Sequence, residues 1–151
     1  MCNPLQTGQE NPVDDTSALT RRMLEDYDTV AVVGLSTDPI KAAHSVPAAM
    51  QAYGWRVIPV NPHADELLGE KVYRRLAEIP GPVEVVNVFR PSAEAADIVR
   101  QAAEIGAKAV WLQLGILSAE ARAIAAEHGI CYVEDRCMAV ERARHALRRA
   151  G

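Results

Sequence analysis

The sequence predicts an α/β fold: a doubly wound, parallel, five-stranded sheet with helices on both faces. Five short and nearly continuous apolar runs are typical of strands buried on both faces, and helical patterns lie between them. Gly54, Gly106 and Gly129 each stand where a helix should end before the next strand, because glycine adopts the left-handed helix-capping conformation without steric penalty. Strands and helices that alternate in this way form a parallel sheet through right-handed crossovers.

The elements can be placed in chain order. Residues 1–15 contain prolines and a glycine without apolar periodicity and are interpreted as a flexible N-terminal arm, whereas residues 16–151 are expected to form one domain. Thr16 or Ser17 can cap a first helix that runs to about Asp26. The predicted strands are 29–34, 56–60, 83–89, 108–112 and 130–134, and the later helices are 44–53, 73–78, 92–105, 118–128 and 138–149. A central first strand favours the Rossmann-like order 3-2-1-4-5, numbered along the chain.

The composition argues against several classes of partner. With 16 basic and 20 acidic residues the formal charge is -4, so the chain has no global attraction to nucleic acid or to an anionic membrane. The longest stretch without charged residues, 42–55, is shorter than the roughly 20 apolar residues of a membrane helix, and residues 1–15 lack the features of a secretory signal. We therefore expect a cytoplasmic protein without nucleic-acid or membrane partners. Its alanine-rich helical faces would permit a homodimer.

The segment after the first predicted strand, 34–45, can hold a phosphate. It contains Gly34, several hydroxyls and one lysine that enters a helix. The N–H groups at the start of that helix supply donors and positive potential, Lys41 adds a charge, and Ser36 or Ser45 adds a hydroxyl. The alternative is an ordinary turn with a solvated lysine.

Three familiar nucleotide signatures are absent. Gly34 is not followed by the further glycines of G-x-G-x-x-G, and the loop lacks the G-K-[ST] of nucleoside triphosphate sites. The second strand ends at 60–62 without the acid that would hold the ribose of NAD, so an NAD or other nucleotide-binding enzyme is an alternative only. The four histidines do not cluster at metal-ligand spacing, and no metal site is predicted.

Polar residues also follow the second and third predicted strands. Asn61 stands between prolines that fix the backbone. This segment could form a flat wall against an adenine, or Asn61 could bond its own backbone, and neither interpretation excludes the other. Arg90 follows Phe89 and either binds a phosphate or pairs with a nearby carboxylate. Arg90 stands at the edge of the sheet where ligands bind, and this position favours a phosphate over a carboxylate as its partner.

The ends of the fourth and fifth predicted strands are less specific. Gln113 lies in an apolar run and needs a partner, which is either backbone or ligand, while Gly115 allows a ligand to approach closely. Arg136 and the start of a helix favour the thiolate of Cys137, although Cys137 is at least as well explained as a small buried residue.

Together these strand ends resemble the small stand-alone CoA-binding proteins, which are similar to the N-terminal CoA-binding domain of the succinyl-CoA synthetase α-subunit. The resemblance covers residues 20 to 145, and no single motif in it is decisive. The stretches that carry it are Val32-Val33-Gly34-Leu35-Ser36, Val57-Ile58-Pro59-Val60-Asn61-Pro62, Leu68-Gly69-Glu70-Lys71-Val72-Tyr73, Val88-Phe89-Arg90, Trp111-Leu112-Gln113-Leu114-Gly115 and Asp135-Arg136-Cys137.

The resemblance implies that the ligand is CoA or an acyl-CoA held along the carboxyl ends of the strands. The matching positions are Gly34, Leu35, Ser36, Lys41 and Ser45 in the phosphate loop, Val60, Asn61 and Pro62 on the adenine side, Phe89 and Arg90 after the third strand, Gln113 and Gly115 along the pantetheine arm, and Arg136 with Cys137 at the far end.

The sequence departs from a complete synthetase, because it has no motif for the phosphorylatable histidine domain or the nucleotide-grasping subunit. The resemblance therefore implies a carrier, sensor or regulatory module rather than a ligase. A redox switch, in which Cys137 forms a mixed disulfide with CoA, is a further alternative.

Overall fold

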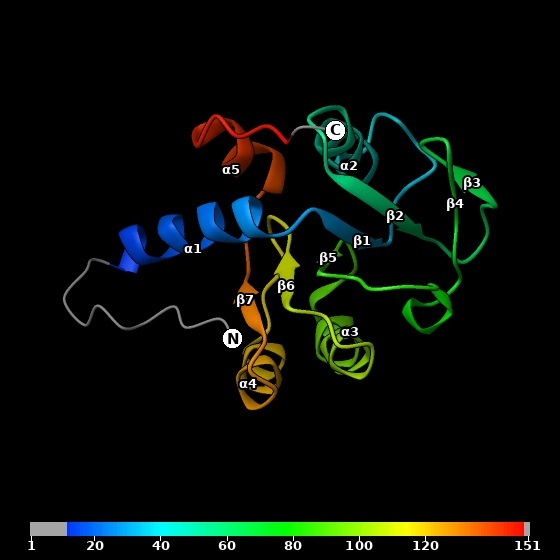
Figure 1. Cartoon of the computed structure of the whole chain (residues 1–151). Helices are drawn as coiled ribbons and strands as arrows, with labels where there is room; N and C mark the ends of the chain where they lie inside the picture. The colour runs from blue at the N-terminus through cyan, green and yellow to red at the C-terminus, as the bar shows by residue number, and fades with distance from the viewer. Residues whose placement is uncertain (1–11, 150–151) are drawn as a thin grey trace.

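A five-stranded parallel sheet forms the centre of the structure, a computed structural model that describes the backbone of residues 12–149 and the side chains of residues 16–149 (Figure 1). The strands are β1 (Thr29–Val33), β2 (Arg56–Val60), β5 (Val85–Val88), β6 (Ala109–Leu112) and β7 (Cys131–Val133). All four neighbouring pairs are parallel. The predicted Rossmann-like α/β class is confirmed.

The predicted strand order is wrong. The sheet has the order β2-β1-β5-β6-β7, which is 2-1-3-4-5 along the chain, because β5 lies beside β1 and not outside β2. Pro59 explains the difference: it has no N–H to donate, and proline within a sheet is confined to edge strands. Its carbonyl accepts the N–H of Tyr73 (3.0 Å) on the outer side of β2, where a single isolated bridge takes the place of a full strand.

Helices cover both faces of the sheet (Figure 1). One face carries α1 (Pro12–Asp26), α2 (Ala42–Ala52) and α5 (Met138–Arg144), and the other carries α3 (Ser92–Glu104) and α4 (Ala119–Glu127). The buried apolar residues divide accordingly into two clusters, one on each side of the strands. Alternate side chains of each strand point to opposite faces, so every central strand contributes to both clusters.

Several element boundaries differ from the predictions. Helix α1 begins at Pro12, four residues earlier than expected, and the rest of the predicted arm, 1–11, lies outside the described residues. Helix α5 ends at Arg144, and the chain continues as a strap whose Arg149 donates its N–H to the carbonyl of Tyr53 (2.9 Å). Between β2 and β5 the chain forms an unpredicted hairpin, β3 (Glu66–Leu67) and β4 (Glu70–Lys71), and the predicted helix 73–78 is reduced to the 3-10 turn η1 (Leu76–Glu78).

A buried polar network links the sheet to α5. The Gln113 side chain is 2% exposed; its Nε2 donates to Asn87 Oδ1 (2.7 Å), and its Oε1 accepts the N–H of Met138 (3.1 Å). Gln113 therefore holds the start of α5 against β5. Each bond lies where water cannot replace it, so a lost partner leaves an unpaired buried group.

We expect Gln113→Leu to lower the free energy of unfolding by about 2–4 kcal/mol, because it orphans both Asn87 Oδ1 and the Met138 N–H. Urea denaturation measures the change. Gln101→Leu is the matched control, since the Gln101 amide bonds Asp97 at the surface, and its effect should stay within about 0.5 kcal/mol. Equal effects of the two substitutions would contradict the assigned role of Gln113.

Candidate functional site

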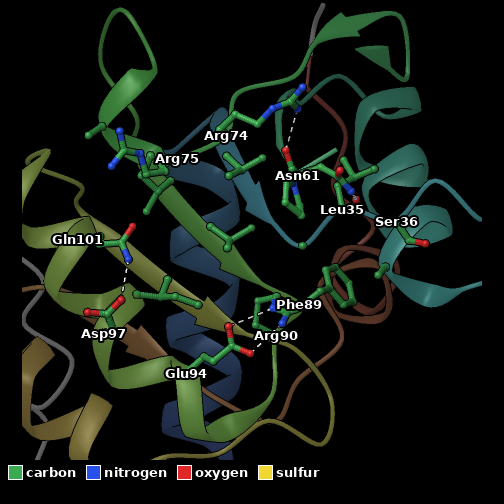
Figure 2. Close-up of a pocket in the computed structure, with 18 of the residues that line it drawn as sticks. Leu35, Ser36, Asn61, Arg74, Arg75, Phe89, Arg90, Glu94, Asp97 and Gln101 are labelled. Carbon is green, nitrogen blue, oxygen red and sulfur yellow. Dashed lines mark hydrogen bonds and ion pairs between the residues drawn. The ribbon is translucent and has the colours of Figure 1, made fainter. Parts of the chain in front are cut away.

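A cleft of about 980 Å³ opens at the carboxyl edge of the sheet, where β1 and β5 lie side by side. The chain leaves β1 for β2 on one side of the sheet, whereas β5, β6 and β7 lie on the other, so neighbouring connections diverge at this point. In open α/β sheets the divergence creates a crevice that binds ligands. The cleft is lined by the loops that follow β1, β2 and β5, by residues 74–77 and by the outer face of α3 (Figure 2).

The loop after β1 requires glycine at its first position. Gly34 has φ +91°, and a Cβ at this residue would lie only 2.7 Å from the carbonyl oxygen of Phe89. The ends of β1 and β5 approach closely at this point. Leu35 is completely buried in the core beneath the loop.

Hydrogen bonds fix the rest of this loop against α2. The Ser36 N–H donates to the carbonyl of Ala43 (3.0 Å), and His44 Nδ1 donates to the carbonyl of Ser36 (2.7 Å). Ser36 Oγ accepts the N–H of Asp38 (3.0 Å). The loop is thus held in one conformation by its own polar groups, which leaves the first turn of α2 facing the cleft.

The first turn of α2 is a positive end of the cleft. Lys41 is the N-cap and makes no capping bond with its side chain, and the turn contains no acidic residue. The first N–H groups of a helix have no intrahelical acceptor and carry the positive end of the helix dipole. The His44 N–H already donates to the Lys41 carbonyl (2.9 Å). Because Lys41 and Ala43 both line the cleft, an anion there would meet the Ala43 N–H and an exposed ammonium.

The wall after β2 is held by Asn61. Its Nδ2 donates to the carbonyl of Leu35 (2.9 Å), and its Oδ1 accepts the N–H groups of His63 and Ala64 (2.8 and 2.9 Å). Asn61 therefore bonds backbone groups, including those of its own turn, which is one of the two roles predicted for it from the sequence. Together with Val60 and Pro62 it lines the cleft.

The basic residues of the cleft differ in how fully their side chains are bonded to other protein groups. Arg74 donates to the carbonyls of Asn61 (3.1 Å) and Ala64, and to the carboxylate of Asp65 (2.8 Å), so it braces the loop after β2. Arg75 keeps 76% of its side chain exposed, with Glu78 at 3.7 Å. Figure 2 shows Arg74 beside Asn61, with Arg75 apart from them on the side toward Gln101.

Arg90 forms the other end of the cleft with Phe89. Its guanidinium donates to both carboxylate oxygens of Glu94 (2.8 and 3.3 Å), and both side chains remain nearly half exposed. This ion pair is the alternative that the sequence left open for Arg90. A ligand would meet a paired, locally neutral group there.

Helix α3 contributes a wall of the cleft that was not predicted, because the predicted site residues all lie at or after the ends of strands. Four polar residues of the cleft lie on one face of this helix: Glu94, Asp97, Gln101 and Glu104. Their spacing of three and four residues is the helical period, which could have revealed the stripe. Residues 74–77 were also missed, because they fall within the predicted helix 73–78 and not at the end of a predicted strand, whereas the structure places them at and just before the 3-10 turn η1.

Nine of the predicted site residues line the cleft together, and five do not. The nine are Gly34, Leu35, Ser36, Lys41, Val60, Asn61, Pro62, Phe89 and Arg90. The five outside its lining are Ser45, Gln113, Gly115, Arg136 and Cys137.

Four of these five lie beyond β5, after β6 and β7. Gln113 has protein partners, as described above. The Gly115 N–H donates to Asp135 Oδ1 (2.7 Å), and the Arg136 carbonyl accepts the indole N–H of Trp111 (2.8 Å). Cys137 is a half-buried free thiol at the N-cap of α5. Ser45 is exposed within α2.

The described part of the chain shows neither a metal-binding cluster nor a membrane-spanning helix. Its histidine, cysteine and acidic side chains form no group of three suited to a metal ion. None of its helices combines the length and apolarity needed to cross a bilayer.

Comparison with known proteins identifies the family. The model of the CoA binding domain matches residues 28–143. The uncharacterized protein YneT of Bacillus subtilis (strain 168) is 38% identical over 134 residues, which are 89% of this chain and 97% of YneT. A hypothetical protein from Pyrococcus horikoshii OT3 has a solved structure with a TM-score of 0.83 and 36% identity, covering 91% of this chain and 98% of that one.

Larger CoA enzymes match over part of their length. The alpha subunit of the ADP-forming acetate–CoA ligase II of Pyrococcus furiosus is 34% identical over 82 residues, 54% of this chain but 18% of the subunit. The dinucleotide-forming acetyl-coenzyme A synthetase 1 of Ca. Korarchaeum cryptofilum, solved with phosphate and ADP, has a TM-score of 0.64 and 27% identity, covering 72% of this chain and 26% of the synthetase. This chain therefore belongs to the CoA binding domain family.

Proposed function

We propose that this chain binds CoA or an acyl-CoA in the cleft between the ends of β1 and β5. The carrying observation is that one cleft combines the uncapped start of α2, the exposed Lys41 and the wall of residues 60–62. CoA has the matching parts: a pyrophosphate, an adenine face and a long arm. Family membership supports the same ligand.

In this proposal the pyrophosphate lies against the first turn of α2. The N–H groups of that turn and the Lys41 ammonium would donate to its oxygens, as helix starts do for anions elsewhere. The adenine would stack on residues 60–62, whose backbone Pro59 and Pro62 stiffen. The arm would follow the strand ends toward β5 and β6.

The 3′-phosphate of CoA would approach Arg75. Arg74 and Arg90 donate hydrogen bonds to protein oxygens, whereas Arg75 lies 3.7 Å from Glu78 and keeps 76% of its side chain exposed. No acid stands at the end of β2, where one would repel this phosphate. The proposal therefore favours CoA over a nucleotide that lacks the 3′-phosphate.

We infer binding rather than ligation as the role of these residues. The chain spans about a fifth of the length of the matched acetate–CoA ligase subunit and about a quarter of the matched synthetase. The cleft pairs Arg90 with Glu94 and holds Asn61 in backbone bonds, so these groups act as fixed walls. A carrier, sensor or regulatory module needs only such a site.

We expect Lys41→Ala to weaken CoA binding about tenfold, or about 1.4 kcal/mol, because it removes one charge-assisted contact to a phosphate. Isothermal titration calorimetry measures the dissociation constant. Lys108→Ala is the control, since Lys108 is an exposed lysine just before β6, at the opposite edge of the sheet. Unchanged CoA affinity in Lys41→Ala would contradict the placement of the phosphate.

We expect CoA to raise the thermal unfolding midpoint more than dephospho-CoA does, and NAD to leave it unchanged, because only ligands of the folded state stabilise it. Arg75→Gln should remove most of the difference between CoA and dephospho-CoA. Arg100→Gln is the control, because Arg100 pairs with Glu120 on α4, outside the cleft. A midpoint raised by NAD and not by CoA would overturn the proposed ligand.

A further inference from the structure

The loop after β6, residues 113–118, presents two large apolar side chains to solvent. Leu114 is 71% exposed and Leu117 is 49% exposed, although Trp111 and Leu112 just before them are completely buried. The two leucines stand three residues apart at the carboxyl edge of the sheet, and the site described above does not use them.

Hydrogen bonds hold this loop in a fixed shape. The Ile116 N–H donates to the carbonyl of Gln113 (3.0 Å), the Gly115 N–H donates to Asp135 Oδ1 (2.7 Å), and the Leu117 N–H donates to Ser92 Oγ (3.1 Å). These donors are already used within the protein, so they do not face outward as a phosphate cradle would require. The chemistry that the loop presents is apolar and rigid.

The loop continues the edge on which the cleft lies. Val33, Val88 and Leu112 are in register across β1, β5 and β6. Neighbouring strands are about 4.8 Å apart, so the loop starts about 10 Å from the end of β1. Ser92, which holds Leu117, directly precedes Ala93 of the cleft wall.

The order of the strands matches the order of the parts of an acyl-CoA. If the adenine lies at β2 and the pyrophosphate at β1, the arm passes β5 and its thioester end reaches β6. We propose that Leu114 and Leu117 form the seat of the acyl chain, so that the ligand is an apolar acyl-CoA and not free CoA. This inference rests on the proposed function of the cleft.

The test is a chain-length series, with the affinities of CoA, acetyl-CoA, butyryl-CoA and hexanoyl-CoA measured by calorimetry. Burial of one methylene strengthens binding by at most about fourfold, so partial cover by two leucines should give about twofold for each methylene added. The double variant Leu114→Gln, Leu117→Gln should flatten the series. Val140→Gln, at an apolar residue of α5 that is 52% exposed, should leave the slope as it is.

The outcomes distinguish a failure of the acyl seat from a failure of CoA binding in the cleft. A flat series with normal CoA affinity overturns the acyl seat and leaves CoA binding intact, whereas no binding by any member overturns both. A slope that survives the double variant also overturns the seat. Sedimentation that shows a dimer dispersed by the double variant, together with a flat series, assigns the leucines to a second copy of the chain instead.

Discussion

The missing N–H of Pro59 constrains the whole arrangement. A strand with proline at this position cannot complete a ladder on its outer side, so β2 stays at the edge of the sheet and pairs with β1 alone. The next full strand must then join the free side of β1, as β5 does. Because β5 pairs with β1, the connections diverge between these two strands, and the cleft lies at that point. Gly34 completes the constraint, because no side chain fits where the two strand ends meet.

The polar groups at the strand ends fall into two sets: one fixes the loops, and the other faces the cleft. Asn61, Arg74 and Arg90 bond to backbone groups or nearby carboxylates, and Gln113, outside the cleft, bonds Asn87 and the Met138 N–H; these bonds hold the loops at the strand ends. The Lys41 side chain makes no capping bond, and Lys41 and Ala43 line the cleft. A site whose walls are fixed by the protein loses little conformational freedom when a ligand binds, and its free donors can act on the ligand.

The sequence predicts local features of this fold well and long-range ones poorly. Apolar runs and terminal glycines locate all five strands of the sheet, because burial on both faces and helix capping act within a few residues. The strand order depends on which distant strands pair, and Pro59 indicates only that the outer side of β2 receives no full strand. Loops at strand ends revealed Lys41 and Asn61, whereas the polar stripe of α3 required attention to helical spacing. For Arg90 and Gln113 the residue type fitted two roles, and only the positions of Glu94 and Asn87 distinguish them.

The charge distribution determines which anions can use such a site. The chain carries a net charge of -4, so an extended polyanion is repelled over most of its length even where one end meets Lys41. A compact ligand with its phosphates close together responds instead to the local field at the start of α2, since charges beyond about 8–10 Å are screened at physiological salt. Past that distance the edge becomes apolar at Leu114 and Leu117. The edge thus favours a ligand that is anionic at one end and uncharged at the other.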